Sequence, residues 1–475
     1  MGVKDMAQKD NVPEYSVAEI SLLSRLSLAA KACRAVTWGL GAALVLLLAA
    51  VSPAWALIVE ASHFTLDNGL QVVVVADRRA PVVTHMVWYP VGSADEPAGK
   101  AGIAHFLEHL LFKGTKSLSP GEFSNIVYRH GGEDNAFTSH DYTAYYEQIS
   151  RDRLAVVMDI EADRMVNLVL TEEDVATERE VVREERREIE NDPAQLLSEQ
   201  VDAALYLAHP YGKPVIGWMA EVEGLGLDDA MEFYRAWYTP RNAIVVVAGD
   251  VTAEEVLALA QKHYGPLGNT ADPIRARTPE PEPIAARRVE MADARAASPV
   301  LQRNYLAPSH ATAEPGEAEA LEVLAEVLGG GPTSRLHSSL VVAAKTAAYA
   351  EASYSGYGLD GGTFIIEAAP NPGGGLDAIE AGINAVIAAI AADGVSEDEL
   401  KRARNRLVAD TVYALDDQFQ LANNIGMALS TGQTVEHVLG FTSRVQQVSA
   451  EDVRAAAAKV LRIERSVTGI LQPEN

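Results

Sequence analysis

The sequence predicts an α+β fold built from two homologous α/β sandwich domains that together form a duplicated half-shell. The chain has 475 residues, more than a single hydrophobic core usually serves, so it is expected to divide. Valine-rich runs typical of strands alternate with hydrophobic patterns of helical period. A proline-rich stretch separates two halves whose elements recur at similar spacing, which favours an internal duplication.

The first element is a leader, residues 1–56. Lys31 and Arg34 precede an apolar run over residues 35–51, and a small-residue cleavage site follows, with cleavage expected after Ala56. This order is typical of a secretory signal peptide, so the sequence predicts export, with the bacterial periplasm as the destination. The alternative is an uncleaved anchor that holds the protein at the membrane, facing the periplasm, since the run is only slightly short for a span.

Composition and charge narrow the classes of function. Hydrophobic residues make up 48% and charged residues 22% of the chain, as in soluble globular proteins. The only cysteine, Cys33, lies in the leader, so a mature chain would contain neither a disulfide nor a thiolate ligand. The net charge of −27 argues against nucleic acid as a partner. It favours a basic peptide substrate, and it fits equally well an acidic surface that serves only solubility.

The N-terminal domain, residues 57–265, is predicted to open with a hairpin whose turn lies within residues 64–70. Further strands and helices are expected in mixed order, as an α+β fold requires. The predicted strands are 71–76, 82–89, 143–149 and 243–248, and the predicted helices are 103–112, 121–130, 153–167, 172–189 and 228–237.

Residues 266–287 have the composition of a linker, and residues 288–475 are predicted to form a second domain homologous to the first. When the C-terminal parts of the two halves are aligned, the helix-then-strand unit over residues 225–247 corresponds to residues 448–470. This agreement supports duplication.

When the halves are aligned on their beginnings, the helix over 103–110 falls on 321–328. Glu108 then meets Glu326, whereas His105 and His109 both meet valines. The second domain is therefore expected to keep the helix and to lack the metal ligands.

The strongest chemical signal is His105-Phe-Leu-Glu108-His109. On a helix these three side chains share one face. Two imidazoles suit zinc, and a nearby Glu that is not a ligand can take a proton from water. The spacing is the inverted form of the commoner zinc-peptidase motif. A histidine pair alone arises too easily by chance, so a third ligand decides the interpretation.

A second predicted helix offers that ligand. Glu178 and Glu185 are seven positions apart, nearly two turns, so they share a face. Val181 and Val182 lie between them and are expected to turn this face inward. The other acids of the helix are predicted to be solvated and ion-paired: Glu180, Glu184 and Glu188.

Together these motifs resemble the pitrilysin/insulinase family of inverted-motif zinc peptidases (inverzincins), which includes mitochondrial processing peptidase. In that family the third ligand is a Glu well after the second His, at the spacing that separates Glu185 from His109 here, with a further Glu seven positions before it. The resemblance therefore implies His105, His109 and Glu185 as ligands of one Zn²⁺ per chain, and Glu108 and Glu178 as catalytic residues. It implies a zinc metalloendopeptidase and covers nearly the whole mature chain, including the runs 68–70, 135–139 and 240–250.

The resemblance also implies that residues 135–138 form an edge strand beside the zinc, which would add an extended peptide to the sheet through backbone hydrogen bonds. Asn135, Ala136 and Phe137 are the candidate substrate-binding residues on this strand. For Phe137, a place in the hydrophobic core is an equally good interpretation.

Two other functions remain open. The chain could be a non-catalytic peptide-binding or assembly subunit on the same fold, although every ligand and Glu108 are present. A purely structural zinc site is disfavoured, because three protein ligands leave one position open.

One departure from the family pattern bears on partners. In single-chain relatives, and in the non-zinc subunits of two-chain relatives, the second half carries an Arg and, seven positions later, a Tyr that hold substrate. Here Tyr349 is present, Val342 stands seven positions before it, and Arg335 is too distant in sequence to be taken as a substitute. Because valine cannot donate a hydrogen bond, we expect a homologous partner subunit to supply the Arg/Tyr pair. The competing expectation is a homodimer or monomer that holds substrate on the edge strand alone.

Overall fold

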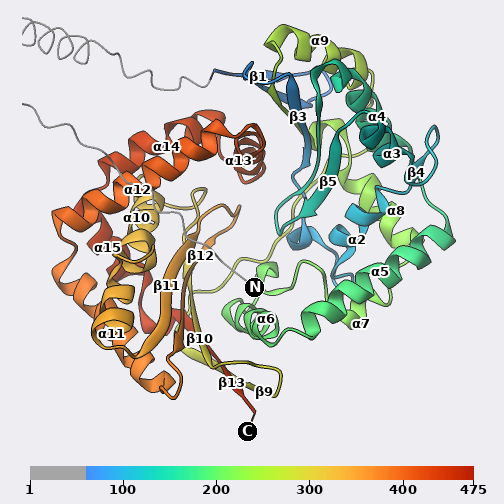
Figure 1. Cartoon of the computed structure of the whole chain (residues 1–475). Helices are drawn as coiled ribbons and strands as arrows, with labels where there is room; N and C mark the ends of the chain where they lie inside the picture. The colour runs from blue at the N-terminus through green and yellow to red at the C-terminus, as the bar shows by residue number, and fades with distance from the viewer. Residues whose placement is uncertain (1–59, 475) are drawn as a thin grey trace, which may run out of the picture. The chain divides into compact units, whose positions relative to one another are not determined.

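Two mixed β-sheets, each with helices packed on it, organise the computed structural model, which describes residues 60–474 (Figure 1). The predicted leader, residues 1–56, lies outside the described residues. Within the described part, no single helix has the length and apolar character needed to cross a membrane. Helices α11 (Leu376–Asp393) and α12 (Glu397–Asp416), which meet at a bend of 106°, satisfy those criteria only as a pair.

The first sheet has the strand order β1-β2-β8-β3-β6-β5. Neighbouring strands are antiparallel except β2 and β8, which are parallel. Its strands are β1 (Ala61–Thr65), β2 (Gln71–Ala76), β3 (Val82–Tyr89), β5 (Glu133–Thr138), β6 (Thr143–Ser150) and β8 (Ile244–Gly249). The predicted hairpin is β1–β2, and β5 is the outermost strand. A separate short pair joins β4 (Gly114–Thr115) to β7 (Leu168–Val169).

The second sheet has the order β11-β12-β10-β13-β9, with a parallel pair only at β13–β9. Its strands are β9 (Arg287–Asp293), β10 (Val300–Ala307), β11 (Ala347–Ser355), β12 (Gly362–Pro370) and β13 (Ser466–Pro473).

Helices fill the intervals between strands in both halves. Those before the second sheet are α2 (Ile103–Leu110), α3 (Glu122–Arg129), α4 (Leu154–Asn167), α5 (Glu172–Glu190), α6 (Pro193–Leu205), α7 (Met219–Val222), α8 (Leu227–Trp237) and α9 (Ala253–His263). The later ones, besides α11 and α12, are α10 (Glu317–Gly329), α13 (Gln418–Ser430), α14 (Val435–Gln447) and α15 (Ala450–Val460).

Equivalent elements build the two sheets. The order β2-β8-β3-β6-β5 in the first corresponds to β9-β13-β10-β12-β11 in the second, and the parallel pair has the same place in both. Strands β3 and β10 have equal length, as do helices α8 and α15, and each pair lies where the sequence comparison of the halves predicts. The predicted α+β fold with two related halves is therefore confirmed.

Each sheet is covered by a helix from the opposite half. Helix α13 packs on β3 and β8 of the first sheet, and α6 packs on β9, β10 and β13 of the second. The α13 contact is close: a Cβ atom at Gly426 would lie 2.1 Å from the Trp88 ring, so only glycine fits there. This exchange joins the apolar cores of the two halves.

The exchange begins at a sharp break between α5 and α6. Helix α5 starts with a capping box in which the Thr171 hydroxyl accepts from the Asp174 backbone N–H. Asp192 then caps α6 by accepting from the N–H groups of Ala194 and Gln195, and Pro193 takes the first helical position. The Asp192 cap and Pro193 therefore start α6 as a separate helix, which packs on the second sheet rather than on the first.

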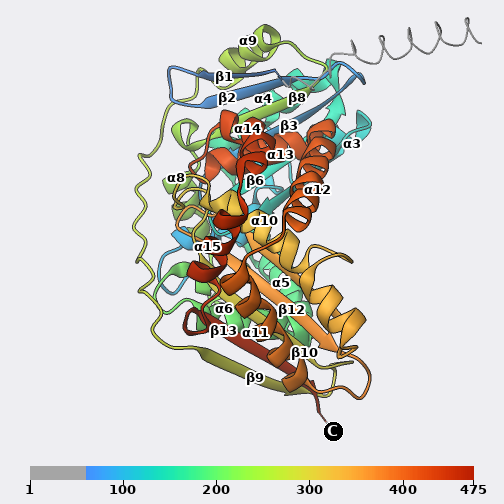
Figure 2. The ribbon, with the colours of Figure 1, turned by 90° about the vertical axis from the view of Figure 1, so that its left-hand side faces the viewer.

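The predicted linker has no regular secondary structure over residues 267–286, and Figure 2 shows it as an extended trace from α9 to β9. It is nevertheless anchored. The buried Arg277 guanidinium pairs with Asp95 at 2.8 Å, Asp141 at 2.5 Å and Asp360 at 2.7 Å. These contacts hold the segment between charges from both halves.

Candidate metal centre

Helix α2 carries the histidine pair and begins where a glycine is required. Gly102 has a φ of +93°, and a Cβ atom there would lie 2.4 Å from the Ile216 carbonyl oxygen. The half-buried Glu96 carboxyl accepts from the N–H groups of Gly102 and Ala104, each at 3.0 Å. Burial raises the pKa of Glu96 to about 8. The first turn of α2 is thus fixed before the motif begins.

The structure brings His105, His109 and Glu185 together. Glu185 Oε2 lies 3.7 Å from His105 Nε2 and 3.5 Å from His109 Nε2. One potential ligand atom from each residue lies within 4.8 Å of the others. Helices α2 and α5 contact each other directly, so the seven-residue spacing on α5 delivers Glu185 to the imidazoles.

This donor set fits a zinc ion. Two imidazole nitrogens and one carboxylate oxygen are zinc ligands of ordinary type, and three protein ligands leave a position for water or substrate. Burial lowers the pKa of His105 to about 3, so its imidazole is neutral, as a ligand must be. The Glu185 side chain is 40% exposed, which leaves this side of the centre open.

Glu178 lies behind His109. Its Oε1 atom is 3.1 Å from His109 Nδ1, and its other oxygen pairs with Lys113. A carboxylate on the second ring nitrogen orients a ligand histidine and fixes its tautomer. The resemblance implied a catalytic role, whereas this geometry makes Glu178 a positioning residue.

Glu108 is buried beside His109 and is held by β5. The Thr138 hydroxyl donates to Glu108 Oε2 at 2.6 Å. Burial raises the pKa of Glu108, and the Thr138 hydrogen bond opposes this effect. Thr138 belongs to the predicted edge strand, but the sequence pattern indicates no role for it there. Strand alternation gives the missing signal, since Thr138 and Ala136 share the face that meets α2.

The other candidates on β5 lie differently from one another. Asn135 is exposed, and its Oδ1 atom accepts from the Ala136 N–H at 2.9 Å. Phe137 points to the opposite face, where its ring centroid lies 5.3 Å from that of Trp88. The core interpretation therefore fits Phe137 better than substrate contact. The outer edge of β5, rather than its side chains, is what remains for a peptide backbone.

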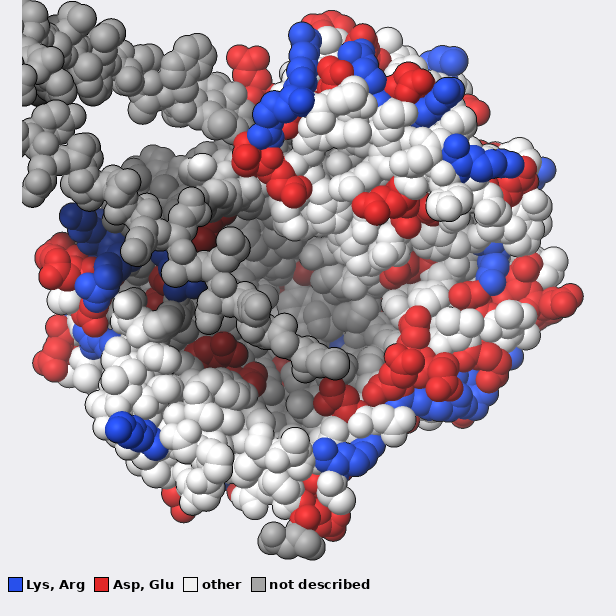
Figure 3. Space-filling view, in the orientation of Figure 1, with Lys and Arg blue, Asp and Glu red and all other residues white. Residues whose placement is uncertain are grey.

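Helix α5 departs from the expectation at Val181. Val182 is fully buried, but Val181 is 42% exposed, because the covering elements reach only one side of the shared face. Glu180 and Glu184 pair with Arg183 and Arg187 as expected, and Figure 3 shows acidic and basic side chains side by side over this helix. Glu188 is exposed as expected, and it also lines a cavity.

That cavity, of about 650 Å³, adjoins the candidate metal centre. His105 and Glu185 line it, together with Thr138 from β5. Its other acidic lining residues are Glu188, Asp192, Glu199 and Asp202, against the single ammonium group of Lys213 among the described lining residues. Glu199 is bound to the Arg186 guanidinium, and burial raises the pKa of Asp202 to about 6, so the acidity of this space comes mainly from Glu188 and Asp192.

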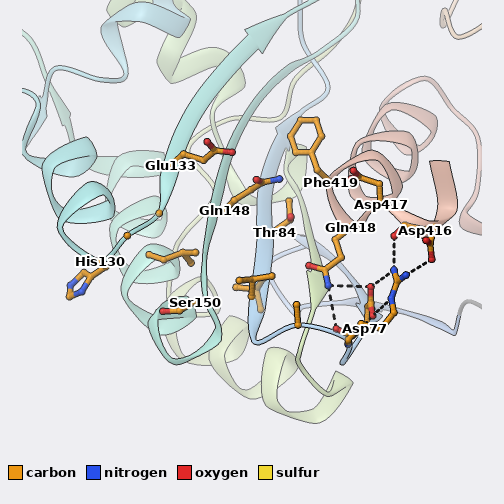
Figure 4. A pocket seen from close by; sticks show the side chains of 17 residues that line it. Asp77, Thr84, His130, Glu133, Gln148, Ser150, Asp416, Asp417, Gln418 and Phe419 are labelled. Carbon is orange, nitrogen blue, oxygen red and sulfur yellow. Dashed lines mark hydrogen bonds and ion pairs between the residues drawn. The ribbon is translucent and has the colours of Figure 1, made fainter. Parts of the chain in front are cut away.

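A cavity of similar size, about 630 Å³, lies elsewhere and lacks this chemistry. Figure 4 shows Asp77 and Asp416 there, the latter from α12, and Arg79 pairs with both. His130 is the one histidine among its described lining residues. It is a junction between the two halves rather than a metal centre.

Tyr349, the remaining predicted site residue, lies on β11 in the second half, and its hydroxyl donates to Glu367 at 2.5 Å. Val342 is 59% exposed, and Arg335 is bound to Glu399 at 2.7 Å.

A cavity of about 520 Å³ is lined by Tyr349 together with Arg406 of α12. Sequence spacing could not reveal Arg406, which reaches this cavity only through the fold.

This chain resembles known protein families and a known zinc protease in sequence. The sequence model of the family described as insulinase, peptidase family M16, matches residues 71–218. The family model described as the peptidase M16 inactive domain matches residues 224–407. The zinc protease PqqE of Helicobacter pylori is 32% identical over 440 residues, covering 92% of this chain and 98% of that protein.

Two solved structures agree in fold. The crystal structure of a protease from Helicobacter pylori has a TM-score of 0.81 and 31% identity, and the match covers 88% of this chain and all of that one. The first half of the periplasmic protease PqqL from Escherichia coli has a TM-score of 0.74 at 21% identity, covering 87% of this chain and 92% of that one. The second likeness concerns the fold alone.

Proposed function

Because this chain belongs to peptidase family M16, the insulinase family, we propose that it is an active zinc metalloendopeptidase that hydrolyses peptides or unfolded protein segments. One observation carries the proposal. Helices α2 and α5 bring His105, His109 and Glu185 within ligand reach of one another, with the buried Glu108 on the same helical face.

In the proposed mechanism one zinc ion is held by His105, His109 and Glu185. When bound, it would supply Lewis acidity that lowers the pKa of water and polarises a peptide carbonyl. Glu108 accepts the proton from water and delivers it to the leaving amine. Thr138 holds the Glu108 carboxylate through its 2.6 Å hydrogen bond, and Glu178 holds the ring of His109.

The substrate is an extended chain paired with the free edge of β5. An edge strand binds through backbone groups and tolerates many side chains. The acidic cavity next to the centre favours basic residues on the substrate, since Coulomb attraction acts strongly in a cleft lined by one sign of charge. Basic, unfolded peptides are thus the preferred class.

Two further parts of the proposal concern location and assembly. The leader predicts export to the periplasm, with an uncleaved N-terminal anchor as the alternative. A homologous partner subunit supplies the Arg/Tyr pair, because Val342 cannot donate a hydrogen bond next to Tyr349.

The deciding experiment compares wild type with Glu108→Gln. We expect both to bind one equivalent of zinc at this centre, and only wild type to cleave an unfolded basic peptide, with a loss of at least about 10²-fold in the variant. Glu180→Gln on the exposed side of α5 is the matched control and should behave as wild type. A zinc-loaded wild type without activity, alone or with a homologous partner chain, would instead support the non-catalytic peptide-binding or assembly subunit.

A further inference from the structure

We propose that the second half of this protein contains its own metal site, formed by His310, Glu319 and His437, which binds a divalent transition-metal ion such as zinc. The site is separate from the peptidase centre. Its role is structural: it ties the loop after β10 to α10 and α14.

The three residues come from three segments that the fold brings together. His310 follows β10, Glu319 lies in the first turn of α10, and His437 lies in the first turn of α14. Helices α10 and α14 are in contact. One potential ligand atom from each residue lies within 4.8 Å of the others, and His310 Nδ1 is 3.9 Å from Glu319 Oε1.

The two histidines repeat the geometry of the first centre. The ring centroids of His310 and His437 are 5.0 Å apart with an interplanar angle of 76°. The corresponding values for His105 and His109 are 4.7 Å and 72°. An edge-on pair of this kind lets one nitrogen of each ring point to a common position.

Unpartnered nitrogens point independently to a ligand. The His310 side chain is only 1% exposed, and within residues 60–474 neither of its ring nitrogens has a hydrogen-bond partner. The same holds for His437 Nε2. Buried polar atoms are rarely left unsatisfied, because each one costs free energy. A shared metal ion would satisfy a nitrogen on both rings at once.

The surrounding charges permit a cation. Glu319 and Glu322 contribute two carboxylates, and Glu322 Oε1 lies 3.5 Å from His310 Nε2. Arg444 opposes them, since its Nε donates to Glu319 Oε1 at 2.5 Å. The second oxygen of Glu319 stays available, because a carboxylate accepts several partners. Two imidazoles with one carboxylate form a donor set for zinc and its neighbours rather than for calcium or magnesium.

Burial of His310 sets the role of this site. Three protein ligands leave one position for water, but the His310 and Glu319 side chains are buried, so an extended peptide cannot reach that position and the ion would stabilise the fold. Helix α14 directly follows α13, which covers the first sheet. A metal ion bound at α14 would therefore stabilise the second half. It would also stabilise α13, the helix of the second half that packs on the first sheet.

The test counts zinc in the full-length chain after removal of all metal, reloading with zinc alone and desalting. We expect two equivalents in wild type, one in His105→Gln/His109→Gln and one in His310→Gln/His437→Gln. His263→Gln is the matched control, since His263 has a side chain that is 7% exposed and an unpartnered Nε2 but only Asp159 beside it. It should keep two equivalents.

Two further readouts make the result decisive. Zinc should raise the Tm of His105→Gln/His109→Gln, which keeps the second site, and should not raise the Tm of a variant that lacks both histidine pairs. His310→Gln/His437→Gln should keep peptidase activity. If it does not fold, one equivalent remaining in His105→Gln/His109→Gln still supports the second site. One equivalent in wild type and none in His105→Gln/His109→Gln would overturn the proposal, as would two equivalents in a folded His310→Gln/His437→Gln. Because the peptidase centre is absent from one variant and intact in the other, failure of this site and failure of the proposed activity are distinguishable.

Discussion

Glu178 Oε1 lies 3.1 Å from Nδ1 of His109, and this contact turns the opposite ring nitrogen, Nε2, toward Glu185 at 3.5 Å. The helix-forming run of α5 thus supplies two carboxylates with different tasks. The later one reaches the metal position, and the earlier one holds a ligand in place.

This division of tasks predicts an order of zinc loss. Glu185→Gln removes a charged ligand and should weaken zinc binding most. Glu178→Gln should weaken it by about 10- to 100-fold, as loss of an outer hydrogen-bond partner does. Glu108→Gln should retain zinc. Competition with a chromophoric chelator measures all three, and equal loss in Glu185→Gln and Glu108→Gln would contradict the assigned roles.

Thr138 should influence rate without affecting metal content. Thr138→Val removes the hydroxyl that donates to Glu108, a hydrogen bond to a charged group worth about 1.5–3 kcal/mol, so kcat should fall by about 10- to 100-fold. Thr138→Ser keeps the hydroxyl and should restore most of the rate. Steady-state kinetics with zinc counted in each sample make the comparison, and an unchanged kcat in Thr138→Val would remove Thr138 from the mechanism.

The acidic cavity predicts a charge preference. Cleavage of a basic peptide should slow as salt rises, because ions screen attraction between separated charges. Glu188→Gln removes a carboxylate from the lining and should raise KM for the basic peptide while leaving a neutral one unaffected. Glu184→Gln, which is bound to Arg187 on the same helix, is the control. A rate indifferent to salt and to peptide charge would refute the preference.

The proposed partner subunit can be tested by purification. We expect the chain with a homologous partner to form a heterodimer by light scattering and to cleave peptide faster than the chain alone. Tyr349→Phe reports on the residue that the chain itself supplies. A fully active monomer that no partner stimulates would instead favour binding by the β5 edge alone, with Arg406 as the cation near Tyr349.

The pair of Arg335 and Glu399 should contribute to stability rather than to substrate binding. The Arg335 hydrogen bond lowers the pKa of Glu399 from 4.5 to about 2. A lowered pKa gives stability that is present above pH 4.5 and lost as pH falls toward 2. Arg335→Met should therefore reduce the free energy of unfolding by about 1–2 kcal/mol at pH 7, after allowance for solvent screening. Urea unfolding at several pH values measures it, and the gap from wild type should narrow below pH 4.5. A constant gap would exclude this cause.

Local patterns predicted most of the first half. Strands at 71–76 and 82–89 have the predicted bounds, and the helix of the histidine pair begins at Ile103 as expected, because periodicity and turn signals act over short ranges. Sequence could also suggest that Glu185 faces the histidines. It could not reveal that Arg406 lines the same cavity as Tyr349, because that placement depends on how separate elements pack.

Packing between distant elements also explains two features that the sequence patterns did not predict, the exposure of Val181 and the anchoring of residues 267–286. The inward place predicted for Val181 was wrong: it shares a helical face with Glu178 and Glu185, yet it is exposed, since periodicity shows which residues share a face but not how far the covering elements extend. The segment over 267–286 has the composition of a linker, and composition could not show that Arg277 fixes it through charges that lie far away in sequence.

The exchange of α6 and α13 has a consequence for how this protein can be divided. Either half produced alone would expose the apolar sheet face that the other half's helix covers, so isolated halves should aggregate rather than fold. A single cut in the segment over 267–286 would be different. The two fragments would stay clasped through α6 and α13, which makes this segment the natural place to divide the gene and recover a working molecule from its pieces.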